Sequence, residues 1–310
     1  GYDKGGEEPT VTDANLYLGY LADGAELGGE VVLRRDLSEK ALEALGKDVG
    51  LDALEVASGV LRVADAEMVR ALRVISVERG LDPRDFALLA FGGAGGMHAC
   101  TLAEELGMGT VLVPRAGGVL SALGLAISDL RSDYVRPRLA DLANVEAAGL
   151  TETFEEMESA AGTDLEGAEY TRRADLRYQG QSFEITVEAG EPLDAEKLEE
   201  RFHAAHEQRY GYRMEDEPVD LVNLRLIATL PVDKPKLEEP EVEGGAEGTR
   251  REANFGGEWI EVPVLDRERM GAGSEVEGPA IVEFKESTCV VRPGWRGAVD
   301  GVGTLVLEKR

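Results

Sequence analysis

The chain has 310 residues, 61 of them acidic and 33 basic, which gives a formal net charge of -28 at pH 7. A charge of that sign repels nucleic acids and anionic membranes, so we expect no nucleic-acid and no membrane partner. No apolar run approaches the ~20 residues of a membrane span, and no basic-then-apolar leader begins the sequence, which predicts a soluble, cytoplasmic protein with room for two domains.

The first part of the chain is predicted to be mostly helical. A helix is expected at Thr12–Leu21, with Asp13 or the threonine before it as the N-cap, and a second helix at Ser38–Leu45. Within Leu51–Arg79, apolar residues recur in alternating steps of three and four, so they form one stripe along a long helix. Gly80 follows this helix as its C-cap.

A glycine-rich loop then lies between a predicted strand and a predicted helix. The apolar run Phe86–Phe91 is bounded by turn residues, which is typical of a strand buried on both faces. It passes directly into Gly92–Gly96 and a helix, which are followed by a short strand at Val111–Val113 and a helix at Val119–Ile127. This order predicts an α/β unit with a mostly parallel sheet.

The second part of the chain mixes helices with amphipathic strands, as in an α+β domain. Helices are expected at Glu146–Ala160 and Leu193–Tyr210. In the strand Ser182–Glu188, Phe183 and the alternate residues after it form an apolar face. Alternate apolar residues within Val222–Leu230 indicate one face of a longer strand.

Composition suggests where the chain divides. Lys234–Gly248 is rich in Pro, Glu and Gly and is predicted to be an exposed linker, and Glu258–Glu308 consists of short strands and turns. We place the domain boundary within residues 135–148. The predicted domains are therefore residues 1–140 and residues 141–310.

The glycine-rich loop is the strongest local signal for a ligand. Without side chains the backbone can approach a ligand closely, and the N-terminus of the next helix offers unpaired N–H groups. Part of a nucleotide fits such a loop, so the candidate cofactor-binding residues are Gly92, Gly93, Ala94, Gly95 and Gly96. The loop matches neither the GxGxxG pattern nor the P-loop, and tight strand–helix packing without a ligand stays open as an alternative.

Five polar residues are further candidates for chemistry. His98 could act as a general acid–base or contact a phosphate, or simply pack locally. Asp13 and Asn15 could bind a cation or a phosphate-bound metal, although helix capping explains Asp13 equally well. His203 and His206 share a helix face, but they lack the His-Glu-x-x-His order and a third ligand nearby, so a solvated helix face is favoured over a metal site.

The remaining compositional features concern redox state and habitat. Cys100 and Cys289 are far apart and form no CxxC pattern, which predicts two small buried or half-buried thiols in a reducing compartment. The acidic residues are spread along the chain and most basic residues are arginine. This favours a halophilic protein of a high-salt cytoplasm over an acidic protein of an ordinary one.

Nine stretches in a fixed order carry a family resemblance. They are Pro9–Leu16, Ser76–Gly80, Asp82–Phe86, Phe91–Gly95, Gly118–Gly124, Asp133–Arg136, Tyr178–Glu184, Tyr210–Tyr212 and Gly278–Glu283. Together they resemble the A subunits of N-methylhydantoinase and 5-oxoprolinase and the related acetone carboxylase β subunit. The resemblance covers essentially the whole chain. One departure is Gly96-Met97, where the family usually has Pro-Leu; it loosens the loop but keeps its backbone donors.

The resemblance implies a fold, and it implies that this chain lacks the upstream half of the subunit. The expected fold is the second lobe of an ATPase similar to actin, hexokinase and heat-shock ATPases, followed by an α+β C-terminal domain. Two acidic phosphate loops lie upstream in the family and are absent here, so we expect the C-terminal half of a subunit. Gly92–Gly96 would then lie near the adenosine and phosphates of ATP, and Mg²⁺ would be held mainly outside this chain, so weak ATP binding or none is expected.

The resemblance also implies an activity. ATP would phosphorylate the carbonyl oxygen of a small cyclic amide such as hydantoin, N-methylhydantoin or 5-oxoproline, after which the ring opens; charge on the transferring group must be stabilised by metal and oriented donors. The implied partners are the N-terminal half of the same subunit and a hydantoinase B-type subunit. An acetone carboxylase-type β subunit and a non-catalytic interaction module stay open as alternatives.

Overall fold

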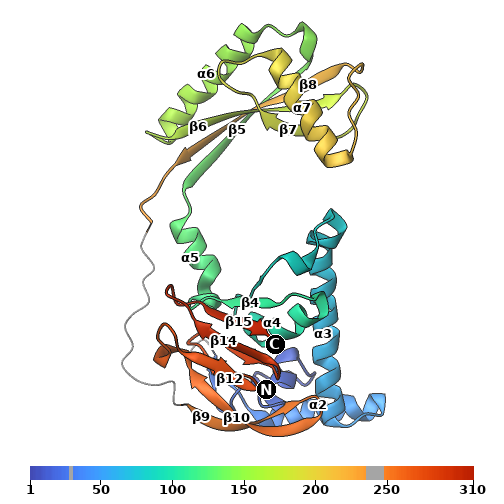
Figure 1. The fold of residues 1–310 in the computed structure, drawn as a ribbon, viewed down its shortest axis with the longest axis vertical. Helices are drawn as coiled ribbons and strands as arrows, with labels where there is room; N and C mark the ends of the chain where they lie inside the picture. Colours follow the sequence, from blue (N-terminus) through green and yellow to red (C-terminus); the bar gives the residue numbers. More distant parts are fainter. Residues whose placement is uncertain (28–30, 235–247) are drawn as a thin grey trace. The chain divides into compact units, whose positions relative to one another are not determined.

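The chain forms two compact units. The computed structural model describes residues 1–27, 31–234 and 248–310 (Figure 1). Gly1–Leu125 and Lys236–Arg310 form the first unit, and Ala126–Pro235 forms the second. Apart from its two end residues, the predicted linker Lys234–Gly248 lies outside the described residues. None of the helices in the described part of the chain combines the length and the apolar content of a membrane span.

The division by contacts differs from the predicted division at residue 140. The C-terminal residues return to the first unit, where Leu305–Lys309 pairs with Thr110–Val113 in one sheet. In Figure 1 these orange and red strands lie among the blue and teal elements of the first unit. The local hydrophobic periodicity of a sequence does not predict pairing between segments so far apart in the chain.

The helices of the first unit are capped by local side chains. Thr10, rather than Thr12 or Asp13, is the N-cap of α1, and Asp13 completes a capping box with it. Asp52 and Glu55 form the same motif at the start of α3. The described helices of this unit are α1 (Val11–Tyr17), α2 (Arg35–Val49), α3 (Ala53–Ile75), α4 (Gly95–Leu106) and α5 (Leu120–Ile127).

The described strands of the first unit form a small hairpin and two larger sheets, in the orders β11-β14-β15-β4-β3 and β13-β12-β10-β9. Helices α1, α2 and α3 pack on one face of the second large sheet, while α4 and the first large sheet pack on its other face. The strands are β1 (Glu26–Leu27), β2 (Val31–Val32), β3 (Leu88–Leu89), β4 (Thr110–Val113), β9 (Thr249–Phe255), β10 (Glu258–Asp266), β11 (Glu275–Glu277), β12 (Ala280–Glu283), β13 (Thr288–Val291), β14 (Trp295–Val299) and β15 (Leu305–Lys309).

Two predictions about the first unit are wrong. The run Phe86–Phe91 is not a strand buried on both faces: only Leu88 and Leu89 pair, at the edge of a sheet. The side chains of Phe86 and Phe91 are 49% and 52% exposed. The sheet is also not mostly parallel, because β3 and β4 are parallel but the C-terminal strand β15 pairs antiparallel with β4.

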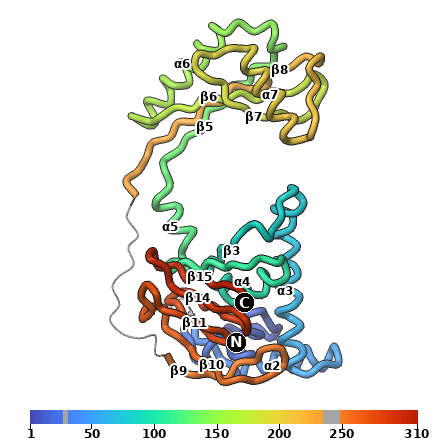
Figure 2. The backbone as a smooth tube through the Cα atoms, viewed as in Figure 1, coloured from blue at the N-terminus to red at the C-terminus, as the bar shows by residue number. Residues whose placement is uncertain are grey.

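The second unit is an antiparallel sheet with two helices on one face. The strand order is β5-β8-β6-β7, and Figure 2 traces β5 and β8 side by side. Both helices contribute to one core with the apolar faces of β6, β7 and β8. The elements are β5 (Leu130–Asp141), α6 (Ala147–Asp164), β6 (Glu169–Tyr178), β7 (Ile185–Glu188), α7 (Ala195–Tyr210) and β8 (Val219–Leu230).

The predicted elements of the second unit are largely present, with two differences. Ile185 and Val187 are buried as predicted, but Phe183 lies before the start of β7 and is 78% exposed. Strand β5 was not predicted, and it runs through the first half of the expected boundary at residues 135–148.

Candidate functional site

Three turns of the first unit meet at the start of α4. The loop Gly92–Gly96 joins β3 to α4, the turn Gly117–Gly118 follows β4, and Glu286 lies between β12 and β13. The amide of Gly92 donates a hydrogen bond to the carbonyl oxygen of Gly117 (2.8 Å). A Cβ on Gly118 would lie 2.6 Å from the Cβ of Glu286, so glycine is needed for this close approach. We call these three turns the glycine corner.

The glycine corner is open to solvent. Gly93 and Ala94 are exposed, and nothing lies within 4 Å of the position that a Cβ of Gly92 would occupy. Ala94 is the N-cap of α4 and offers no side-chain cap, and the N–H of Met97 donates to its carbonyl oxygen (3.0 Å), so the N–H groups of Gly95 and Gly96 are the ones left without a partner within the helix. These donors and the positive end of the helix dipole suit a phosphate or another polar group.

The last residues of the loop have a packing role. Gly96 is buried, and a Cβ there would lie 2.7 Å from the carbonyl oxygen of Thr288, on β13. Gly95 is half-buried and is the first residue of α4. The two interpretations of the loop therefore apply to different residues: Gly96 permits tight helix–strand packing, and Gly92–Ala94 leave space for a ligand.

His98 is buried beside the glycine corner. Its Nδ1 lies 2.7 Å from Oδ1 of Asp65 on α3, and the two side chains are 5% and 13% exposed. This pair joins α4 to α3, which supports the alternative of local packing. An acid–base role for His98 stays a prediction.

Asp13 and Asn15 are engaged within the fold. Asp13 accepts hydrogen bonds from the backbone and hydroxyl of Thr10 (2.8 and 2.7 Å), from the Ser38 hydroxyl (2.6 Å) and from the Gly1 amino group. Burial raises the pKa of Asp13, but these hydrogen bonds outweigh it and hold the pKa below its ordinary value. The side-chain amide of Asn15 donates to a carbonyl oxygen of its own helix (3.0 Å).

A Mg²⁺ site is not apparent around these residues. Both carboxylate oxygens of Asp13 already accept hydrogen bonds, and across residues 1–27, 31–234 and 248–310 no three His, Cys, Asp or Glu side chains form a group that could hold a metal ion. The side chains of the described residues therefore do not fit a resident Mg²⁺ ion.

The paired histidines of α7 lie inside the second unit, so the predicted solvated face is wrong. His203 and His206 are 6% and 1% exposed. The Tyr178 hydroxyl accepts the Met214 N–H (2.9 Å) and shares a second hydrogen bond with Nδ1 of His203 (2.7 Å). Nδ1 of His206 donates to the carbonyl oxygen of Tyr212 (2.8 Å). These hydrogen bonds and the surrounding aromatic rings give both histidines a structural role.

The two cysteines are buried thiols, as predicted. Cys100 on α4 and Cys289 on β13 belong to the same core, and both are free. Burial raises the pKa of Cys100 to about 12 and that of Cys289 well above its ordinary value. Neither thiol is therefore suited to act as a nucleophile.

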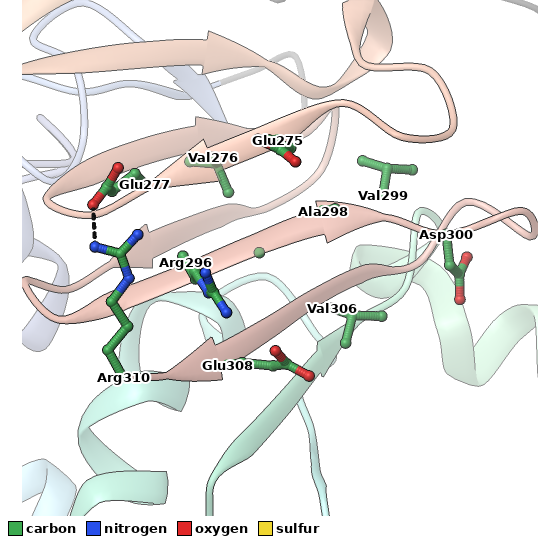
Figure 3. Close-up of a pocket in the computed structure, with 11 residues that line it drawn as sticks. Glu275, Val276, Glu277, Arg296, Ala298, Val299, Asp300, Val306, Glu308 and Arg310 are labelled. Atoms are coloured by element: carbon green, nitrogen blue, oxygen red, sulfur yellow. Dashed lines mark hydrogen bonds and ion pairs between the residues drawn. The ribbon is translucent and has the colours of Figure 1, made fainter.

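A second hollow is lined by residues other than those of the glycine corner. It is a groove of about 700 Å³ over β11, β14 and β15 (Figure 3). Carboxylates from Glu275, Asp300 and Glu308 line it, and Glu277 pairs with Arg310 (2.8 Å). It contains none of the predicted site residues, so it offers no support for the predicted activity.

Comparison with known proteins identifies the family. The family profile described as hydantoinase/oxoprolinase matches residues 1–134, and the profile of the hydantoinase/oxoprolinase C-terminal domain matches residues 141–309. The chain belongs to the hydantoinase/oxoprolinase family. The predicted family is thus confirmed, and the two profiles meet between residues 134 and 141, inside β5.

Curated relatives of this hydantoinase/oxoprolinase chain include enzymes of cyclic amides. The caprolactamase α subunit of Pseudomonas jessenii is 35% identical over 99% of this chain and 47% of its own length. 5-Oxoprolinase 1 of Arabidopsis thaliana is 28% identical over 99% of this chain and 26% of its own length. An uncharacterised protein of Methanocaldococcus jannaschii is 38% identical, with coverages of 99% and 46%. The chain spans about half the length of these relatives or less.

Solved structures confirm the fold class. The ATP-dependent caprolactamase of Pseudomonas jessenii superposes with a TM-score of 0.80 at 34% identity, covering 99% of this chain and 48% of that one. Nucleotide-free acetone carboxylase gives a TM-score of 0.82 at 25% identity, covering 100% and 48%. The chain therefore has the mixed α/β fold of the matching part of these actin-like ATPases.

Proposed function

We propose that this chain is part of the A subunit of an ATP-dependent cyclic-amide hydrolase and that its glycine corner faces the nucleotide. The observation that carries the proposal is the open glycine corner at the start of α4, in a chain of the hydantoinase/oxoprolinase family. Relatives named caprolactamase and 5-oxoprolinase support a cyclic amide as the substrate class.

The chain's own contribution would be to bind and orient the nucleotide. Gly92, Gly93 and Ala94 present backbone without bulky side chains, and the N–H groups at the start of α4 are directed to the same corner. ATP, when bound, supplies the phosphoryl group that activates the carbonyl oxygen of the ring amide. Because the side chains of the described residues do not fit Mg²⁺, the negative charge on the transferring phosphoryl group would be balanced mainly by protein segments outside this chain.

Exposed apolar residues support a missing covering part. Phe86, Leu89 and Phe91 are exposed along the edge strand β3. Apolar groups in such number are expected beneath another part of a larger subunit. We therefore propose the preceding half of the subunit and a hydantoinase B-type subunit as partners.

An acetone carboxylase-type β subunit is the second candidate. It is supported by the TM-score of 0.82 against acetone carboxylase, which is close to the 0.80 against caprolactamase. Both candidates use the same scaffold, and the substrate distinguishes them.

Phosphate release from ATP by the complete subunit with its B-type partner tests these alternatives. We expect stimulation by caprolactam, hydantoin or 5-oxoproline and none by acetone with bicarbonate. The reverse pattern identifies the carboxylase. No stimulation by any of them, together with no ATP binding, would leave the non-catalytic interaction module. The isolated chain is expected to bind ATP weakly, and tight Mg²⁺-dependent binding in calorimetry contradicts an incomplete cleft.

A further inference from the structure

A groove of about 660 Å³ opens at the carboxyl ends of β10 and β12. These strands are parallel, and their last residues, Asp266 and Glu283, are partners in the register. Ligands of α/β proteins bind preferentially beyond the carboxyl ends of parallel strands. The other parallel pair among the described strands is β3 and β4, and the carboxyl ends of both lead into the glycine corner.

The groove borders the glycine corner. Glu286 belongs to the corner, and the residue before it, Lys285, lines the groove. Arg115, two residues before Gly117, forms an ion pair of 2.7 Å with Glu268, which also lines the groove. The carboxyl ends of the two parallel pairs therefore lead to neighbouring positions.

The carboxylates that line this groove already have partners. Glu283 pairs with Arg251 at 2.6 Å, and Glu268 pairs with Arg115 at 2.7 Å. Asp266 accepts the backbone N–H of Glu268 at 2.9 Å. Each acidic side chain of the groove is thus engaged by a donor of the fold.

Two cations of the same groove have no such partner. Lys285 and Arg269 are exposed, and within the described part of the chain neither forms an ion pair or a side-chain hydrogen bond. Lys285 is one of only eight lysines in a chain with 61 acidic residues. Cations left without carboxylates in so acidic a chain are suited to an anion from outside, because ammonium and guanidinium groups form charge-assisted hydrogen bonds with oxyanions.

We propose that this groove is an anion subsite next to the glycine corner, where Lys285 and Arg269 bind the phosphate or carboxylate group of a small ligand. Only the identity of that ligand, the nucleotide or its co-substrate, rests on the proposed function. The site itself rests on the parallel strand ends, the groove and the uncompensated cations.

Calorimetric titration of the 310-residue chain at constant ionic strength tests the subsite. Pyrophosphate serves as the phosphate probe and acetate as the carboxylate probe. Lys285→Gln and Arg269→Gln are each expected to weaken binding of the preferred probe about tenfold, the effect of losing one charge-assisted contact. Lys40→Gln is the matched control, because Lys40 is an exposed lysine on α2 and is expected to leave binding unchanged.

The outcomes separate this inference from the proposed function. No saturable binding of either probe, or equal weakening by Lys40→Gln, overturns the anion subsite. ATP serves as a third ligand, tested with Gly93→Val in the complete subunit. Probe binding that depends on Lys285, while the complete subunit binds no ATP, supports the subsite and removes the nucleotide corner. ATP binding that depends on Gly93, together with probe binding that is unchanged by Lys285→Gln, supports the nucleotide corner and overturns the anion subsite.

Discussion

Replacing Gly93 by valine distinguishes a loop that faces a ligand from a loop that only packs. Gly93 is exposed and does not have a positive φ. A Cβ there would approach only the carbonyl oxygen of Glu286, at 3.7 Å, which is an ordinary van der Waals distance. We therefore expect the free energy of unfolding to change by no more than about 1 kcal/mol.

Binding of ATP is expected to respond much more strongly than stability. A branched side chain at Gly93 fills the space through which a nucleotide would approach the backbone, so KM for ATP in the complete subunit should rise at least about tenfold, or ~1.4 kcal/mol. Gly96→Ala is the matched control. Its Cβ would lie 2.7 Å from the carbonyl oxygen of Thr288, so it should destabilise the fold by about 1–3 kcal/mol.

Steady-state ATP hydrolysis and denaturant unfolding of both variants show whether the loop faces the nucleotide or only packs. Unchanged kcat and KM in Gly93→Val, with normal stability, would refute the reasoning and leave the loop a packing element. A large loss of stability in Gly93→Val would refute the statement that its surroundings are open.

Four further predictions concern stability and reactivity. Despite burial, hydrogen bonds from the Gly1 amino group, Ser38 and Thr10 hold the pKa of Asp13 below its ordinary value in the folded 310-residue chain. Its carboxylate therefore stabilises the fold above about pH 4, and this contribution is lost as the pH falls through the folded pKa; Asp13→Asn should flatten the acid limb of a pH–stability curve. Tyr178→Phe should destabilise the second unit by about 1–3 kcal/mol, measured by denaturant unfolding, since it leaves Met214 N–H and His203 without a partner. Cys100, with a pKa of about 12, should resist iodoacetamide at pH 8 until the chain unfolds, and rapid native labelling contradicts its burial. If the charge of -28 reflects a high-salt cytoplasm, the melting temperature should rise with KCl concentration, and a salt-independent value speaks against that origin.

Local patterns predicted the helices well because each one carries its own signals. The apolar stripe within Leu51–Arg79 became α3. The predicted C-cap was misplaced: α3 ends at Ile75 with Ser76 as its C-cap, and Gly80, with a positive φ of 77°, caps the short 3-10 helix Val77–Arg79 that follows. The N-cap of α1 was misplaced because Thr10, Thr12 and Asp13 are all suitable capping residues. Asp13 does take part in the cap, but as the third helical residue.

Burial or exposure that depends on distant segments of the chain could not be predicted locally. The run Phe86–Phe91 has the composition of a covered strand, yet β3 is the edge of its sheet in this chain. Strand β5 was missed because its charged residues and Pro137 interrupt any apolar alternation, and only its pairing with β8 defines it. His203 and His206 were expected in solvent because the aromatic rings around them come partly from β6 and the loop after α7.

The candidate site was predicted only in part. Gly92–Gly96 and the stretch beginning at Gly118 were recognised from glycine content and family resemblance. Glu286 and Lys285 were not, because their turn joins the site through the parallel pairing of β10 with β12, which involves residues far along the chain.

Photolabelling with a photoreactive ATP analogue tests the central claim most directly. After irradiation of the complete subunit, peptide mapping should find label on Gly92–Met97 or on Gly117–Leu120, and excess ATP should suppress it. Label confined to other peptides, with these two unmodified, would contradict a glycine corner that faces the nucleotide.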